Sequence, residues 1–162
     1  MYYLIISYLL LKIQKKVLIK QLQLANRLNL PVVIHCREAY GDMIEILKEN
    51  KNLLSSSGTF HCYCGSLEIA QEVIKLGLYI SVGGVSTFKN STRLQETIKQ
   101  IPLEKIILET DCPYLSPHPF RGKRNEPAQV ATIAGHLAEL KGTNLEEIEK
   151  VTSENARRLF GI

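Results

Sequence analysis

The sequence has 162 residues, of which 45% are hydrophobic and 22% charged, a composition typical of a folded domain with a buried core. This composition excludes collagen-like, disordered and disulfide-dense proteins, and four cysteines in a chain of this length do not suggest a secreted disulfide framework. The net charge of +4 indicates anionic partners only weakly. Because nothing in the sequence resembles a linker, we expect a single domain over residues 1–162.

The first eleven residues are atypical because residues 2–11 are apolar except for Ser7. A helix that crosses a bilayer needs about 20 residues, so this run is too short to span one. A signal peptide carries its positive charges first, whereas the lysines here begin at Lys12, after the apolar run. The pattern favours a buried strand or an atypical start. We therefore expect no membrane partner and a cytoplasmic location.

From Lys12 onward, patterns typical of helices and strands alternate along the chain. Apolar spacing and short runs rich in Val and Ile predict these elements in order: helix 12–29, strand 32–36, helix 40–51, strand 59–63, helix 67–76, strand 78–82, helix 91–100, strand 105–109, helix 127–141 and helix 145–160. Ser66 and Asn144 are the predicted N-caps, and Glu147 completes a capping box with Asn144.

Strands separated by single helices predict an α/β fold with a parallel sheet. Four strands are clear, and the apolar start would make a fifth. No Gly-x-Gly-x-x-Gly motif follows a strand, and there is no phosphate-loop signature, which argues against a nucleotide-binding doubly wound fold.

Polar residues follow the predicted strands at their carboxyl ends. His35 and His61 end two neighbouring strands, and Glu109 and Asp111 follow the last one. Active sites of parallel barrels gather at this end of the sheet, and His and Asp are common ligands of divalent metal ions. A lone strand histidine is more often a core residue than a ligand. The two interpretations stay open from the residues alone, and the three strand ends together favour a metal site.

Each candidate ligand is followed by a cysteine, namely Cys36, Cys62 and Cys112. Successive strand residues point to opposite faces, so we expect these cysteines to face the helix layer as small core residues. A cysteine zinc site is the alternative, but Cys62 and Cys64 lack the usual two-residue spacing.

The remaining histidines, His118 and His136, lie in a loop and on a helix face. We predict that both are solvated or structural. His118 opens a basic stretch that continues through Arg121, Lys123 and Arg124. Such a loop can bind nucleic-acid phosphates independently of base sequence, or it can be an ordinary solvated loop.

Five segments in order resemble the TatD family of deoxyribonucleases: residues 30–38 (LPVVIHCRE), 60–62 (FHC), 108–115 (LETDCPYL), 121–127 (RGKRNEP) and 153–161 (SENARRLFG). The resemblance covers about residues 13–162. It implies an incomplete (β/α)8 TIM-like barrel with parallel strands and outer helices, of the amidohydrolase type, that uses divalent metal ions (Mg, Mn or Zn) to cleave DNA phosphodiester bonds. The expected substrate is single-stranded DNA.

The same resemblance implies roles for individual residues. His35 and His61 would bind one metal ion, and Asp111 would bind a second and position the attacking water. Glu109 would support the site as a further carboxylate. The basic residues implied to lie near the substrate phosphates are Arg121, Lys123 and Arg124.

The chain departs from the family at its beginning. Family members open with a His-x-His strand and later supply a metal-binding Glu, but no His precedes His35 and no acidic residue precedes Glu38 here. We therefore expect the first three strands and part of the metal site to be missing. An open half-barrel exposes strand edges, so self-association or an N-terminal complementing chain is the expected compensation. The alternative functions are a catalytically silent fragment that binds nucleic acid, a pseudogene product, or a hydrolase with another substrate.

Overall fold

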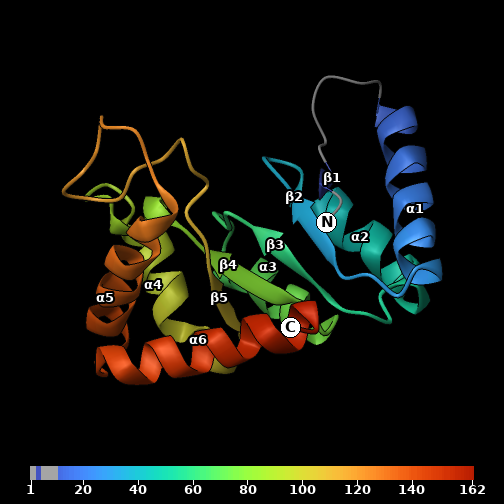
Figure 1. Ribbon diagram of the computed structural model, residues 1–162. Coiled ribbons are helices and arrows are strands. Elements are labelled where there is room, and N and C mark those ends of the chain that lie inside the picture. The colour runs from blue at the N-terminus through green and yellow to red at the C-terminus, as the bar shows by residue number, and fades with distance from the viewer. Residues whose placement is uncertain (1–2, 5–10) are drawn as a thin grey trace.

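The computed structural model describes residues 3–4 and 11–162, in which strands and helices alternate along the chain (Figure 1). The elements are β1 Tyr3–Leu4, α1 Leu11–Arg27, β2 Val32–His35, α2 Tyr40–Glu49, β3 Gly58–His61, α3 Leu67–Lys75, β4 Tyr79–Val82, α4 Thr92–Gln100, β5 Ile106–Leu108, α5 Val130–Lys141 and α6 Leu145–Phe160. Four short 3-10 turns join them at Lys51–Leu53, Gly84–Thr87, Leu103–Lys105 and Pro127–Gln129. Every predicted element is present, and the strands are shorter than predicted. The predicted strand at the start is represented by β1, residues 2 and 5–10 of the apolar run lie outside the described residues, and Leu11 begins α1.

The sheet is parallel throughout, in the order β1-β2-β3-β4-β5. Sequential order is what right-handed strand–helix–strand units produce when each new strand is added beside the previous one. Within the described ranges β1 and β5 have one neighbour each, so the sheet is open and not a closed barrel. The architecture confirms the predicted α/β fold with an incomplete TIM-like barrel.

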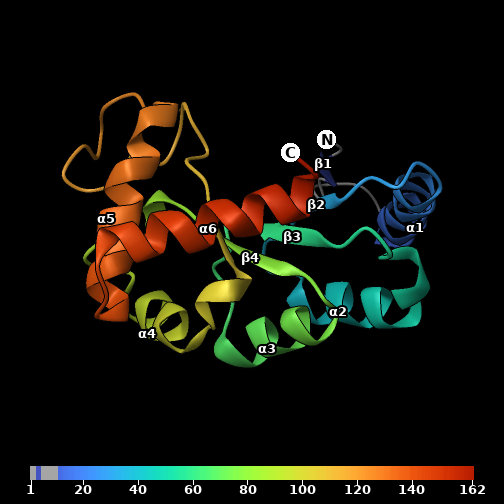
Figure 2. The ribbon, with the colours of Figure 1, turned by 60° about the horizontal axis from the view of Figure 1, so that its bottom comes forward.

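The core lies between the sheet and the helices α1–α5. Alternate strand residues such as Ile34, Phe60 and Ile80 are buried on this outer face, where they join apolar side chains of the helices, among them Leu22 and Met43. Figure 2 shows α2, α3 and α4 together on this side of the sheet. Burial of this apolar area is the main force that holds the strands in place.

Helix α6 lies on the opposite side of the sheet, which we call the inner face. The strand residues on this face are Val33, Thr59, Tyr79 and Ile107. Figure 2 shows α6 crossing this face. Its residue Leu159 packs against Tyr79 and Ile107 in a small second core. The helix therefore covers the amino-terminal part of the inner face, and the carboxyl ends of the strands lie beyond it.

Both predicted N-caps are confirmed. The Ser66 side chain accepts a hydrogen bond from the Ile69 amide, and the Asn144 side chain accepts one from the Glu147 amide. Each cap satisfies an amide at the first turn of a helix and stabilises it by about 1 kcal/mol. No helix in the described ranges is both long and apolar enough to cross a membrane.

Candidate active site

The carboxyl ends of β2 and β3 bring two histidines together. His35 and His61 are register partners at the last positions of these strands, and their ring centroids are 5.7 Å apart. Both side chains follow the inner-face alternation, because Ile34 and Phe60 point into the core on the other side. Parallel pairing with short strands is therefore sufficient to place the two imidazoles side by side.

His61 joins the histidines to the acidic residues that follow β5. Its Nδ1 lies 2.7 Å from Glu109 Oε2, and its Nε2 lies 3.4 Å from Asp111 Oδ1. A carboxylate only accepts, so Nδ1–H is the donor to Glu109. In the neutral ring, Nε2 then carries a lone pair that faces the Asp111 carboxylate. Two acceptors at this separation repel each other unless a proton or a metal cation lies between them.

The electrostatics of His61 agree with this geometry. The hydrogen bond to Glu109 raises the pKa of His61 above its ordinary value, against the lowering effect of burial, and the charges of Glu109 and Asp111 add to the rise. The site therefore attracts a positive charge at Nε2. A bound divalent ion in place of the proton satisfies the same attraction, so protons compete with metal binding at low pH.

Glu109 is half-buried, and its second oxygen is available. Among the described residues, Oε1 has no hydrogen-bond partner although it is buried. A Cβ atom built on Gly83 would lie 3.5 Å from this oxygen, at ordinary van der Waals distance, so Gly83 lies directly beside the carboxylate. An unsatisfied buried carboxylate oxygen is costly unless water or a cation binds it.

The residues present fit one side of a metal-ion shell. Two ligands at about 2.0–2.1 Å from one zinc ion, at a tetrahedral angle, lie about 3.3 Å apart, close to the 3.4 Å between His61 Nε2 and Asp111 Oδ1. However, no three His, Cys, Asp or Glu side chains in residues 3–4 and 11–162 are arranged to hold an ion. Among the described residues, the cluster of His35, His61, Glu109 and Asp111 therefore offers only a partial set of ligands for an ion.

The basic loop that follows Asp111 is exposed. The Arg121 guanidinium lies over the Phe88 ring at 4.2 Å, which fixes its position, and Lys123 lies 6.0 Å from the Phe120 ring centre. Arg124 lines a pocket of about 280 Å³ with Cys112, Pro113 and Asn125–Pro127, next to Asp111 in the chain. The predicted phosphate-binding residues thus lie on the loop that continues from the acidic cluster.

The prediction that the cysteines after the ligands are core residues was wrong for two of three. Cys36 is buried, but Cys62 is half-buried and Cys112 is exposed. β3 ends at His61 and β5 at Leu108, so strand alternation no longer applies at these positions. Cys62 and Asp111 both have positive φ angles, 45° and 55°, which redirect the chain immediately after each strand.

Cys64 differs from the other thiols, because a hydrogen bond from the Cys62 thiol lowers its pKa from 9.0 to about 7. Burial raises the pKa of Cys36 to about 11. We therefore expect iodoacetamide to alkylate Cys64 at a rate that rises as the pH passes through about 7, while Cys36 stays unmodified at neutral pH. Mass spectrometry of each cysteine peptide measures both rates. Equal rates for the two thiols at pH 7.5 would contradict the expectation, and Cys64→Ser should remove the fast phase.

The other two histidines lie apart from the cluster. His136 donates from Nε2 to the Ser86 carbonyl at 2.8 Å. His118 is exposed, and its backbone amide donates to Thr87 Oγ1. These contacts are structural, as predicted. Sequence reasoning missed two residues of the site region: Gly83, beside Glu109, and the buried Asn125. The signal for Asn125 was its place within the RGKRNEP segment, where only the basic residues were assigned a role.

These features define a class: a segment of a parallel α/β barrel with histidines and carboxylates gathered at the carboxyl ends of its strands. The chain belongs to the TatD related DNase family, whose model matches residues 8–161. The resemblance found in the sequence is thereby confirmed.

Individual relatives agree with the family assignment. The chain is 49% identical over 150 residues to an uncharacterized metal-dependent hydrolase, YabD, of Bacillus subtilis (strain 168). This match covers 93% of this chain and 58% of that protein. It is 38% identical over 147 residues to the putative deoxyribonuclease TATDN3 of Mus musculus, covering 91% and 48%. The crystal structure of YjjV, a TatD homolog from Escherichia coli K12, superposes with a TM-score of 0.88 at 33% identity, over 93% of this chain and 57% of that one. The chain thus spans about half the length of these relatives.

Proposed function

We propose that this chain forms part of the active site of a metal-dependent hydrolase that cleaves phosphodiester bonds of single-stranded DNA. The observation that carries the proposal is the pair of contacts of His61, whose Nδ1–H binds Glu109 while its Nε2 faces Asp111. An imidazole oriented by one carboxylate, with its other nitrogen beside a second carboxylate, is the usual arrangement around a catalytic metal. The family description and the name of the mouse relative support DNA as the substrate.

Each residue has a definite task in this proposal. His35, His61 and Asp111 would supply part of the ligands of divalent metal (Mg, Mn or Zn), and further ligands would come from outside the described residues. The metal would supply positive charge and lower the pKa of bound water. Glu109 keeps His61 in the tautomer that leaves Nε2 without a proton. Asp111 also accepts a hydrogen bond from the attacking water and orients it.

The basic loop would hold the substrate. Arg121, Lys123 and Arg124 are exposed on the segment that follows Asp111, where they can bind phosphates on either side of the cleaved bond. Contacts to phosphate oxygens carry no base information, so we expect binding that depends on salt and little on sequence.

The test is digestion of end-labelled single-stranded DNA by the purified chain with Mg²⁺, Mn²⁺ or Zn²⁺, and with a chelator. We expect metal-dependent shortening of the DNA at a reduced rate, because the described residues supply only part of the ligand set. A double variant, His35→Ala with His61→Ala, prepared identically, controls for contaminating nucleases. Salt-sensitive DNA binding without any cleavage would instead support the second candidate, a silent nucleic-acid-binding fragment.

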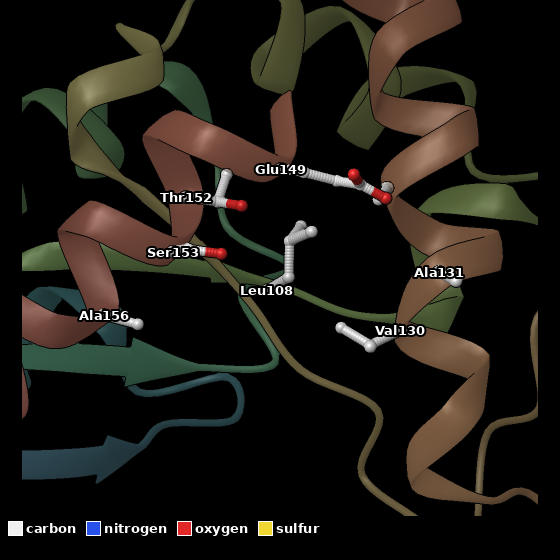
Figure 3. Close-up of a pocket in the computed structure, with 8 residues that line it drawn as sticks. Leu108, Val130, Ala131, Glu149, Thr152, Ser153 and Ala156 are labelled. Atoms are coloured by element: carbon white, nitrogen blue, oxygen red, sulfur yellow. The ribbon is translucent and has the colours of Figure 1, made fainter. Parts of the chain in front are cut away.

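We further propose that residues from outside the described sheet complete the site along β5. Within the described ranges β5 pairs only with β4, and beside it lies a groove of about 220 Å³ between α5 and α6, with Leu108 and Val130 in its lining (Figure 3). The relatives are longer than this chain, so the occupant we expect is a parallel strand of the barrel portion that this chain does not span. Its carboxyl end would lie next to Asp111 and add the lacking ligands. A monodisperse monomer of this chain with full cleavage activity would contradict this proposal.

A further inference from the structure

Asn125 is a buried polar residue in an otherwise exposed loop. Only 1% of its surface is accessible, whereas the residues on both sides, Arg124 and Glu126, are exposed. A buried amide must satisfy its donors and acceptor within the protein. The contacts it makes therefore indicate what the loop is built to hold.

Within the described part of the chain, the hydrogen bonds of Asn125 join it to one short segment and to its own neighbour. The side-chain amide donates to the carbonyl of Thr110 and to the carbonyl of Tyr114, both at 2.6 Å. Its backbone amide donates to the Pro113 carbonyl at 3.1 Å, and its Oδ1 accepts from the Glu126 amide at 2.9 Å. Asn125 thus binds three carbonyls of the turn over residues 110–114.

Asp111 lies within this turn, directly after Thr110. Its φ angle is 55°, in the left-handed region that a residue with a Cβ rarely adopts and that costs of order 1–3 kcal/mol. The Tyr114 amide donates to the Asp111 carbonyl at 3.0 Å, which closes the turn. Such a conformation persists only where surrounding contacts impose it, and the bonds from Asn125 flank Asp111 on both sides.

We infer that Asn125 is a positioning residue, which holds the turn over residues 110–114 so that the Asp111 carboxylate faces His61. The hydrogen bonds that Asn125 makes with the described residues go to backbone groups and not to the Asp111 carboxylate. It acts through the backbone, and it also joins the turn to the basic loop, since Arg124 directly precedes it. The inference rests on the proposed function, because the carboxylate it positions is a metal ligand only under that proposal.

The chain offers a matched control. Asn155 on α6 is 2% exposed, and its amide also donates to two backbone carbonyls, of Leu103 at 2.9 Å and Ile106 at 2.8 Å. These carbonyls lie at the amino-terminal end of β5, away from Asp111. Alanine at either position removes two side-chain bonds to backbone carbonyls at nearly the same burial, and Asn125→Ala also loses the bond that Oδ1 accepts from the Glu126 amide. Thermal unfolding of both variants measures the difference in stability that this third bond causes.

The experiment compares Mn²⁺ affinity of Asn125→Ala and Asn155→Ala, measured by titration calorimetry, with thermal unfolding of both. We expect Asn125→Ala to weaken Mn²⁺ binding about tenfold or more, as loss of a supporting hydrogen bond around a metal ligand does, and Asn155→Ala to leave it within a factor of two. Equal Mn²⁺ affinities in the two variants would overturn the inference.

A second readout needs neither metal nor activity. Hydrogen exchange of the backbone amides over residues 110–116 should accelerate in Asn125→Ala and stay unchanged in Asn155→Ala. If the wild-type chain binds no Mn²⁺, the proposed function fails, and the exchange rates alone then decide whether Asn125 holds the turn. Unchanged exchange in Asn125→Ala would overturn the inference in either case. If Asn125→Ala does not fold, Asn125→Ser, which keeps a donor of shorter reach, takes its place in both measurements.

Discussion

Replacing Asp111 by asparagine is expected to lower metal-dependent cleavage of single-stranded DNA by about a hundredfold or more. The substitution keeps the shape of the side chain but removes the negative charge that faces His61 Nε2 at 3.4 Å. A positioned group that takes part in proton transfer contributes about 10²–10⁴-fold to a reaction rate. Under the proposed function, loss of a metal ligand adds to this effect. Initial rates of cleavage at several Mn²⁺ concentrations measure the change.

The matched control for this variant is Asp42→Asn. Asp42 lies on α2 and accepts a hydrogen bond from Lys15 at 2.8 Å, in a partly exposed ion pair. Such a pair contributes at most about 1 kcal/mol to stability, and its loss should leave the cleavage rate unchanged. If Asp111→Asn cleaves as fast as Asp42→Asn, then Asp111 is not part of the active site, and a contaminating nuclease becomes the explanation of any activity.

The order of the elements could be predicted from the sequence because local signals and the tertiary fold agree. Val- and Ile-rich runs such as residues 32–36 form strands, and the side chains of Ser66 and Asn144 cap helices where expected. Parallel strands end at one edge, so the meeting of His61 with Asp111 followed from strand positions alone. Agreement between local preference and global packing is what makes such a prediction possible.

Other features depend on geometry that no local pattern encodes. The orientation of Cys112 could not be predicted, because β5 ends at Leu108 and the left-handed turn at Asp111 reverses the expected face. The position of α6 across the inner face depends on where Leu159 meets Tyr79, which is a contact between residues far apart in the sequence. The role of Asn125 likewise depends on hydrogen bonds to backbone carbonyls. Every residue type has a backbone carbonyl, so the sequence does not show which ones Asn125 will bind.

Truncating Phe60 to alanine is expected to lower the free energy of unfolding by about 3–5 kcal/mol. Phe60 is 1% exposed in the middle of the sheet, and its ring stacks on that of Tyr40 with centroids 6.4 Å apart. The total stability of a domain is only about 5–15 kcal/mol, so this single change removes a large part of it. Urea unfolding followed by circular dichroism measures the loss.

The same side chain connects stability with the site, because Phe60 points into the core and the next residue, His61, points to the inner face. Anchoring Phe60 therefore fixes the side on which His61 meets Glu109. Tyr114→Ala is the control, since Tyr114 is 71% exposed and its loss should change the free energy of unfolding by no more than about 0.5 kcal/mol. A cost below about 1 kcal/mol for Phe60→Ala would mean that the core beneath β3 is not packed as described, and the alignment of His61 with the two carboxylates would then lose its structural basis.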